Sequence, residues 1–458
     1  MTSNWRVLVA NRGEIAVRII KACQELGIET VVAVSEADRE SLPARLANRA
    51  VCIGPPRSID SYLKVGTIIT AALGTGANAI HPGYGFLCEQ PELAEACVQN
   101  GLIFIGPTVD NIRKMGDKDL ARKIAIEAGI PVILGSDVVQ NYEEAAVAAE
   151  KVGYPVLLKA AAGGGGRGIL IVSRPDGLRT NFHVSSAEAH AAFGDGRLYM
   201  EHFFSNARHI EVQVLGDQFG NVIHVGERDC SIQRRYQKIV EEAPSPIVSG
   251  KLRQEITDAA LVIAKCIKYE SAGTVEFIMD LDTHKFYFME MNTRIQVEHP
   301  VTEMISGLDL IKEQIKIATN NPLSISQSSV RFNGHSIECR INAESPEAGF
   351  RPCPGKITKW LPPQGPGIRV DTHCYPGYFV PPYYDSLIAK VITTGDDRYE
   401  SIERMKYALA NFTVSGIDTT IPFHRVLLNH PDFVSGKVNT RWIENCMLPA
   451  YYPEGNGS

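Results

Sequence analysis

The chain has 458 residues, of which 44% are apolar and 21% are charged, as in ordinary globular proteins. This length exceeds one hydrophobic core and predicts two or three domains. The net charge of −6 lacks the basic excess of nucleic-acid-binding proteins, and no apolar run is long enough to cross a bilayer. The ten cysteines include no Cys-x-x-Cys pair, so we expect a reduced, soluble protein of the cytoplasm without a zinc or disulfide framework.

The first third of the chain alternates short apolar runs with segments of helical periodicity. The runs at 7–10, 28–34 and 102–105 are separated by helix-length segments, which predicts βαβ units and a parallel sheet. Ligands of such sheets bind in loops at the carboxyl ends of strands, where the segments 11–14 and 81–85 occur. For the glycines of 81–85 alone, a plain turn is the simpler interpretation.

A glycine-rich loop at 163–168 lies between two apolar strands, 156–159 and 169–172. It satisfies the pattern G-x-G-x-x-G, but in dinucleotide-binding folds that pattern joins a strand to a helix, so the context excludes this interpretation. We expect a hairpin whose backbone amides bind a polyphosphate, with positive charge from Arg167 and Lys159. The alternative is a flexible surface hairpin.

The segment 229–244 is the most densely charged of the chain. Such a run is usually a solvated helix face, but its apolar spacing is poor, and we predict a loop that lines a cleft. Farther on, the polar segment 324–329 predicts a linker, and 335–341 and 386–392 predict strands of a last domain.

The stretch 290–303 follows an apolar run at 285–289, for which we predict a buried strand paired with 274–278, so that Glu276 lies near Glu290. If the strand continued, its alternate residues would share one face. These residues are Glu290, Asn292, Arg294, Gln296 and Glu298. The alternative is an edge strand whose polar face is solvated. If the strand is buried instead, its charged side chains must be paired or bound to a metal, which predicts a site for a hard cation and an anion.

Glu276, Glu290 and Asn292 form an oxygen-only ligand set of the kind that suits Mg²⁺ together with nucleotide phosphates. Glu298 combines with Lys238 and Arg294 to give a base beside two anion-binding groups. These patterns indicate a magnesium–nucleotide enzyme that also binds a small anion.

In combination, these motifs resemble the biotin carboxylases of the ATP-grasp superfamily, the ATP-using component of biotin-dependent carboxylases. The resemblance extends from about residue 6 to about residue 446, and its most specific segments are 10–16, 81–87, 163–168, 290–303 and 338–344. It implies an α/β protein in several parts. These are a Rossmann-like N-terminal domain at 1–116, an ATP-grasp domain at 117–330 with a mobile lid at about 131–204, a mixed α+β C-terminal domain at 331–447, and a tail at 448–458.

The activity that the resemblance implies is ATP-dependent carboxylation of biotin by bicarbonate through carboxyphosphate, with two Mg²⁺ or Mn²⁺ ions. By motif position, the residues implied to bind ATP are Lys118, Lys159, Gly164, Gly165, Gly166, Glu201, His209 and Gln233, and those implied to hold the ions are Glu276, Glu290 and Asn292. The residues implied to bind bicarbonate are Lys238, Arg294, Gln296 and Val297, with Glu298 as general base, Arg340 stabilising the biotin enolate and Tyr84 near biotin.

Two positions depart from the family pattern. Tyr236 occurs where the family often has His or Asn, which leaves a phosphate contact at that position unassigned, and Ala161-Ala162 occur where Ser-Gly is common. Neither belongs to the implied catalytic set.

The partners are implied by what the sequence lacks. The biotin attachment sequence Ala-Met-Lys-Met is missing, so we expect biotin on a separate carrier protein and a separate carboxyltransferase. The resemblance also implies a homodimer, with Lys21, Glu25 and Arg369 at matching interface positions. Acetyl-CoA is the foremost expected acceptor, although propionyl-CoA and pyruvate systems share this component.

Two rival functions stay open at this point. Another ATP-grasp ligase would share the nucleotide site, but has no need for Arg294 and Glu298 together with Arg340. A nucleotide-binding regulatory subunit without turnover predicts a degenerate base or metal set, whereas Glu276, Glu290 and Glu298 are all present.

Overall fold

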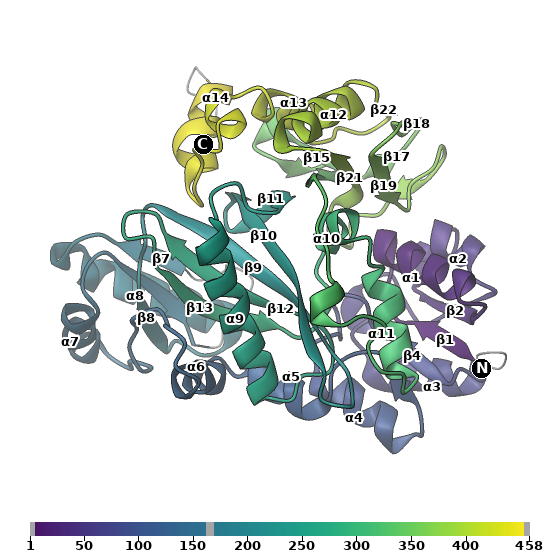
Figure 1. The fold of residues 1–458 in the computed structure, drawn as a ribbon, viewed down its shortest axis with the longest axis horizontal. Helices are drawn as coiled ribbons and strands as arrows, with labels where there is room; N and C mark the ends of the chain where they lie inside the picture. The colour runs from purple at the N-terminus through teal and green to yellow at the C-terminus, as the bar shows by residue number, and fades with distance from the viewer. Residues whose placement is uncertain (1–4, 162–168, 453–458) are drawn as a thin grey trace.

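The computed structural model describes residues 5–161 and 169–452, and three sheets organise it. Figure 1 places the N-terminal sheet at the right, a three-stranded sheet at the left and the C-terminal region at the top, around a long central sheet. No helix among the described residues has the length and apolar character needed to span a bilayer.

The N-terminal region is a parallel sheet covered by helices, as predicted. Its strand order is β3-β2-β1-β4-β5, and all neighbouring pairs are parallel. The strands are β1 (Arg6–Val9), β2 (Glu29–Val34), β3 (Arg49–Cys52), β4 (Ala79–His81) and β5 (Ile103–Phe104). The helices are α1 (Gly13–Glu25), α2 (Leu42–Leu46), α3 (Val65–Thr75), α4 (Pro91–Gln99) and α5 (Val109–Gly116). The segments 11–14 and 81–85 lie at the carboxyl ends of β1 and β4, as expected.

The central sheet has eight antiparallel strands in the order β13-β12-β9-β10-β11-β14-β21-β19. These strands are β9 (Ala207–Gly216), β10 (Val222–Arg234), β11 (Gln237–Ala243), β12 (Ser271–Asp280), β13 (Phe286–Asn292), β14 (His335–Asn342), β19 (Ile368–Thr372) and β21 (Leu387–Gly395). The helices of this part of the chain are α6 (Lys118–Glu127), α9 (Gly250–Cys266), α10 (His299–Ser306) and α11 (Leu310–Ala318). One apolar cluster joins α1 and β1 to α11, which fixes the N-terminal sheet against the central one.

A third, small sheet forms a unit with two helices at the left of Figure 1. Its strands are β6 (Val156–Ala160), β7 (Ile169–Val172) and β8 (Leu198–His202), and its helices are α7 (Tyr142–Val152) and α8 (Pro175–Phe193). Strands β6 and β7 are antiparallel, as the hairpin prediction requires. The loop with Gly164, Gly165 and Gly166 lies outside the described residues.

The remaining C-terminal elements cover the far end of the central sheet. The strands are β15 (Glu344–Ser345), β16 (Arg351–Pro352), β17 (Gly355–Lys356), β18 (Lys359–Leu361), β20 (Phe379–Val380) and β22 (Thr413–Ser415). The helices are α12 (Arg398–Ala410), α13 (Ile421–Leu427), α14 (Pro431–Val434), a π-helical turn (Ile443–Met447) and α15 (Leu448–Tyr451).

One sequence expectation is wrong, and two others are sharpened by the structure. Strand β13 ends at Asn292, so the continuation through Glu298 that was considered does not occur, and β13 is an edge strand. The segment 229–244 is no loop, because β10 and β11 form a hairpin whose turn residues Arg235 and Tyr236 have φ of 50° and 64°. Strands β14 and β21, predicted as strands of the last domain, are present and continue the same sheet as β11.

Candidate functional site

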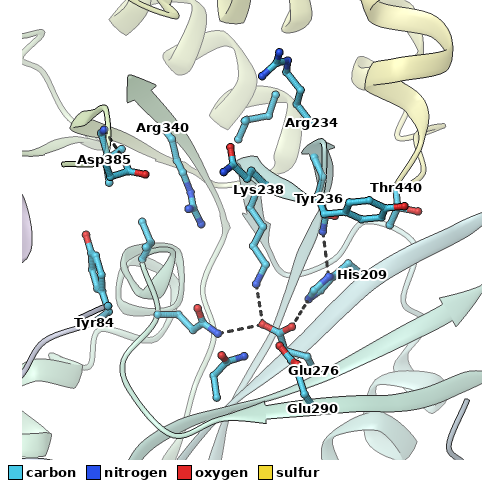
Figure 2. A pocket seen from close by; sticks show the side chains of 18 of the residues that line it. Tyr84, His209, Arg234, Tyr236, Lys238, Glu276, Glu290, Arg340, Asp385 and Thr440 are labelled. Carbon is cyan, nitrogen blue, oxygen red and sulfur yellow. Dashed lines mark hydrogen bonds and ion pairs between the residues drawn. The ribbon is translucent and has the colours of Figure 1, made fainter. Parts of the chain in front are cut away.

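A cavity of about 900 Å³ lies where the N-terminal loops, the small sheet and the central sheet meet (Figure 2). It brings together most of the site residues predicted from the sequence. Those that line it are Tyr84, Lys118, Lys159, Glu201, His209, Gln233, Lys238, Glu276, Glu290, Asn292, Arg294, Gln296, Val297 and Arg340. Glu298 lies fully buried behind the wall and contacts the lining residues.

The loop after β13, although it is no strand, positions the groups that the sequence predicted to bind an anion. Glu89, which sequence reasoning missed, accepts from the Thr293 backbone N–H at 3.1 Å and from Arg294 Nε at 2.8 Å. Arg294 in turn donates to Asn292 at 3.0 Å and to Gln296 at 3.1 Å. The guanidinium is therefore fixed at the cavity wall with charge available to an anion.

Lys238 is the centre of a buried carboxylate cluster. Its Nζ donates to Glu211 at 2.6 Å, Glu276 at 2.9 Å and Glu298 at 2.7 Å. Burial alone would lower the pKa of Lys238, but these carboxylates raise it well above its usual value. The lysine is therefore a fixed cation.

Glu211 belongs to this cluster and was missed from the sequence. The fully buried Arg228 donates to it from Nε at 2.5 Å and also to Thr302 at 2.9 Å. The signal was present, because charged side chains at inward positions of apolar strands such as β9 and β10 must be paired. Pairing partners, however, depend on strand order.

Glu298 lies between two cations. Its Oε1 accepts from Lys238, and its Oε2 accepts from Arg340 Nη2 at 2.9 Å. Burial would raise the pKa of Glu298, but Lys238 and Arg340 hold it well below its usual value. The side chain is therefore ionised at neutral pH and can accept a proton.

Arg340 has a second carboxylate partner, since its Nε donates to Glu241 at 2.6 Å. Burial raises the pKa of Glu241 to about 7, although Arg340 opposes this shift. Glu241 was also missed from the sequence. It orients the guanidinium whose other side contacts Glu298.

Glu276 and Glu290 face each other across β12 and β13, as predicted, and both line the cavity. The pKa of Glu290 is raised by burial and by the nearby charge of Glu276. A divalent cation between the two carboxylates would relieve this repulsion, so the donor set fits Mg²⁺. Lys118 Nζ is 3.9 Å from Glu290, and Asp117 caps α6 so that Lys118 is its first residue.

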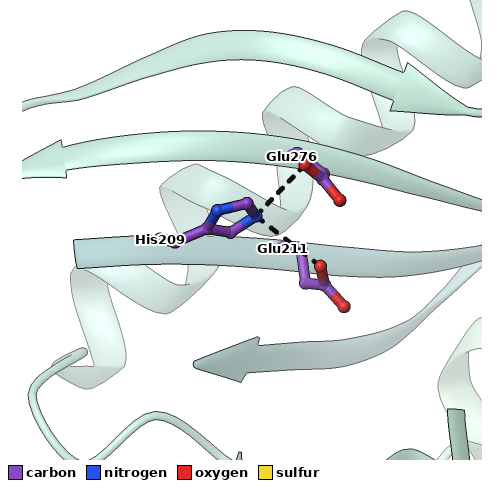
Figure 3. Close-up of side chains that lie close together, drawn as sticks. All are labelled: His209, Glu211 and Glu276. Atoms are coloured by element: carbon purple, nitrogen blue, oxygen red, sulfur yellow. Dashed lines mark ion pairs between the residues drawn. The ribbon is translucent and has the colours of Figure 1, made fainter. Parts of the chain in front are cut away.

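A second group of potential metal ligands lies beside the first (Figure 3). His209 Nε2 is 3.2 Å from Glu276 and 3.7 Å from Glu211. A nitrogen ligand among carboxylates favours Mn²⁺ more than Mg²⁺. On its other side, the His209 ring contacts Gln233 Nε2 at 3.1 Å from Nδ1.

The small sheet contributes one ion pair to the cavity, between Lys159 of β6 and Glu201 of β8. Tyr236 lies at the hairpin turn, is 41% exposed and lines the same cavity (Figure 2). The departure at position 236 thus places a phenol at the cavity wall.

Tyr84 donates its hydroxyl to the buried Glu14 carboxylate, which also contacts Lys390. Glu14 and Lys390 were missed as site residues. Lys390 is the one charged residue of β21, Glu14 is one of four charged residues of α1, and nothing in the local pattern links the two.

Family models cover nearly the whole chain. They are "Biotin carboxylase, N-terminal domain" at residues 3–112, "Carbamoyl-phosphate synthase L chain, ATP binding domain" at 117–326 and "Biotin carboxylase C-terminal domain" at 338–445.

Curated relatives agree with these models. Biotin carboxylase 1 of Bacillus subtilis is 55% identical over 440 residues, which cover 96% of this chain and 98% of that protein. A pyruvate carboxylase subunit from Methanothermobacter thermautotrophicus is 49% identical over 96% of this chain and 89% of that protein.

Solved structures share the fold. A biotin carboxylase complex with β-γ-ATP from Campylobacter jejuni has a TM-score of 0.93 at 48% identity and covers 96% of this chain and 98% of that one. The biotin carboxylase domain dimer of Hydrogenobacter thermophilus 2-oxoglutarate carboxylase, in complex with MgADP, ADP and bicarbonate, has a TM-score of 0.92 at 49% identity and covers 98% and 97%.

Proposed function

This chain belongs to the biotin carboxylase family, and we propose that the cavity described above carries out its ATP-dependent carboxylation of biotin. The enzyme uses ATP, a divalent cation and bicarbonate, and its biotin is attached to a carrier protein. The observation that carries the residue assignment is Glu298, a buried carboxylate held between Lys238 and Arg340 at the wall of the cavity.

The nucleotide side of the cavity consists of Lys118, Lys159, Glu201, His209 and Gln233, which bind ATP in this proposal. Glu276 and Glu290, with Asn292, would hold the divalent ions, which neutralise phosphate charge when bound. Gly164, Gly165 and Gly166, which lie outside the described residues, are assigned to ATP binding in the same proposal.

Bicarbonate binds between Arg294 and Lys238, with further contacts to Gln296 and Val297. A bicarbonate oxygen attacks the γ-phosphorus of ATP, the bond from that phosphorus to ADP breaks, and Glu298 takes the bicarbonate proton. The product is carboxyphosphate. Because the anion shares Lys238 with Glu298, its binding weakens the hold on the carboxylate and strengthens it as a base.

Carboxyphosphate then breaks into CO₂ and phosphate. The phosphate takes the proton of the biotin ureido nitrogen, and that nitrogen attacks CO₂. Arg340 stabilises the negative charge that develops on the ureido oxygen, as fixed guanidinium groups do for oxyanions. Tyr84 forms the wall beside biotin.

The domain boundaries at 116, 330 and 447 and the lid at about 131–204 belong to the same proposal. A separate carrier protein, a separate carboxyltransferase and a homodimer are its partners, with acetyl-CoA as the foremost acceptor. The cytoplasmic location stays a prediction, which the ten unpaired cysteines support.

The test is ADP release from Mg-ATP, with bicarbonate and free biotin each added or omitted, for the unaltered chain and for Glu298→Gln. We expect release that requires bicarbonate, rises with biotin and falls by about 10²-fold or more in the variant. The matched control is Glu255→Gln, an exposed residue of α9.

Turnover indifferent to bicarbonate and biotin would instead indicate another ATP-grasp ligase. Nucleotide binding without turnover would indicate a regulatory subunit.

A further inference from the structure

Lys390 is a lysine that solvent does not reach. Its exposed fraction is 0%, it comes from β21, and it lies behind the cavity wall rather than in it. A buried ammonium is costly unless it is fully paired, so its contacts are informative about its role.

Two contacts of Lys390 reach residues that line the cavity. Its Nζ donates to the Val297 carbonyl at 2.7 Å and lies 3.1 Å from Glu14 Oε1. The same Glu14 oxygen accepts the hydroxyl of Tyr84. A continuous chain of contacts therefore runs from Tyr84 through Glu14 and Lys390 to Val297.

These four residues come from four distant parts of the sequence. Glu14 is in the first turn of α1, Tyr84 follows β4, Val297 lies in the loop before α10, and Lys390 is in β21. Without Lys390, the loop before α10 and the N-terminal sheet would not share this charged anchor.

The surroundings of Lys390 are acidic. In the sheet, Lys390 is in register with Arg340 of β14 and Asp371 of β19. Among the described residues, the buried Glu338 has no hydrogen-bond partner for either carboxylate oxygen, and Lys390 is the cation that most opposes the rise that burial causes in the pKa of Glu338. Arg369 also lies nearby, and it is bound to Asp371. Lys390 thus contacts one carboxylate, Glu14, and the charges of Glu14, Glu338 and Asp371 together raise the pKa of Lys390 against the effect of burial.

We propose that Lys390 is a positioning residue. Through Glu14, it fixes Tyr84, which forms the cavity wall beside biotin, relative to Val297, which lies in the loop that binds bicarbonate. It touches neither substrate, because it is fully buried. The inference rests on the proposed function, which assigns Tyr84 to biotin and Val297 to bicarbonate.

The experiment compares Lys390→Met, Lys390→Arg and Glu14→Gln by steady-state ADP release, with ATP, bicarbonate and free biotin varied in turn. In Lys390→Met we expect KM for bicarbonate and for biotin each to rise about tenfold or more, with KM for ATP within about twofold. Lys390→Arg keeps the charge and should recover much of the loss. Lys251→Met, at a side chain that is 90% exposed, is the control for the substitution itself.

A purely structural role would lower activity without separating the three KM values, and that result would overturn the proposal, as would unchanged KM values for bicarbonate and biotin. If Lys390→Met shows no cooperative unfolding transition, Glu14→Gln decides the matter. It retains the shape but weakens the acceptor shared by Lys390 and Tyr84, and should raise both KM values about threefold.

The outcome for the unaltered chain separates the two proposals. Absence of bicarbonate-dependent and biotin-dependent ADP release there defeats the proposed function. If the unaltered chain releases ADP normally and the variants keep the same KM values for bicarbonate and biotin, only the positioning role is defeated.

Discussion

The central sheet and the small sheet both line the cavity, but they hold their charged side chains differently. On the central sheet, the Lys238 side chain is 13% exposed and contacts three carboxylates, Glu211, Glu276 and Glu298. On the small sheet, Lys159 has one carboxylate partner among the described residues, Glu201, and each side chain of this pair is 18% exposed. The two lysines are similarly shielded from water, so the difference lies in the number of partners: three carboxylates fix Lys238, whereas one holds Lys159.

The two regions also differ in how their cores are built. Among the described residues, the apolar core of the small-sheet unit consists of residues between 139 and 200. Its contacts with the central sheet include a hydrogen bond of 2.7 Å from Phe288 N to the Pro131 carbonyl. They also include stacking of Phe204 on Tyr287, with ring centroids 5.1 Å apart. A unit with its own core and few joints can move as one body, which supports the proposed lid.

The largest effect is expected from Lys238→Met. It leaves three buried carboxylates without their shared cation, which costs about 3–5 kcal/mol of stability. Bicarbonate-dependent ADP release should fall by about 10³-fold, because the base and the anion site are both disturbed. Urea unfolding and ADP release measure the two effects, and unchanged stability would show that this cluster is not the rigid part of the site.

A smaller effect is expected from the corresponding change on the small sheet, Lys159→Met. The loss of one charged hydrogen bond costs about 1–3 kcal/mol, and KM for ATP should rise about tenfold. KM for bicarbonate should stay constant, since the anion site is on the other sheet. An equal rise in KM for ATP and in KM for bicarbonate would contradict the proposal that the small sheet binds ATP and the central sheet binds bicarbonate.

Acid should weaken the central sheet through Glu242, which is buried in β11. Burial would raise the pKa of Glu242, but Arg398 and His335 lower it to about 2. Because the folded-state pKa is depressed, this stabilisation is present above the ordinary value of 4.5 and is lost as the pH falls toward 2. At neutral pH it amounts to about 3 kcal/mol.

Urea unfolding of the unaltered chain and Glu242→Gln, measured between pH 7 and pH 3, tests this expectation. The difference in unfolding free energy between the two should shrink as the pH falls. A difference that stays constant would show that Glu242 is not the group that titrates.

The smallest effect is expected from Phe204→Leu, at a joint between the two regions. The loss of ring stacking costs about 0.5–1.5 kcal/mol. Hydrogen exchange should quicken around 131–134 and 203–206, while exchange in β9 and β12 stays as it was. Phe219→Leu, at an exposed ring 58% accessible, is the control.

Sequence patterns predicted the local elements well. Apolar runs gave β1, β2 and β6, and the pairing of Glu276 with Glu290 followed from two adjacent strands and a short connection. Fourteen predicted site residues line the cavity that this pairing helps to form, namely Tyr84, Lys118, Lys159, Glu201, His209, Gln233, Lys238, Glu276, Glu290, Asn292, Arg294, Gln296, Val297 and Arg340. Most of those positions, however, came from the family resemblance rather than from the local pattern.

The residues that were missed are those whose partners depend on tertiary structure. Glu89 holds Arg294 from 205 positions away in the chain, and Glu241 holds Arg340 from 99 positions away. The hairpin at 229–244 was missed because its buried charges, such as Asp229 and Glu241, imitate a polar loop when their partners are unknown.

The continuity of the central sheet also limits how this protein can be recombined. A chimera that exchanged everything after residue 330 would have to rebuild the hydrogen-bonded ladder between β11 and β14, including the pair Val240 and Cys339, with a foreign strand. A replacement strand that did not match β11 would leave β11 as an edge open to pairing with other chains. Crossover points that leave the ladder intact lie in the connections on either side of the small-sheet unit, so we expect this unit to be the part of the protein that can be exchanged.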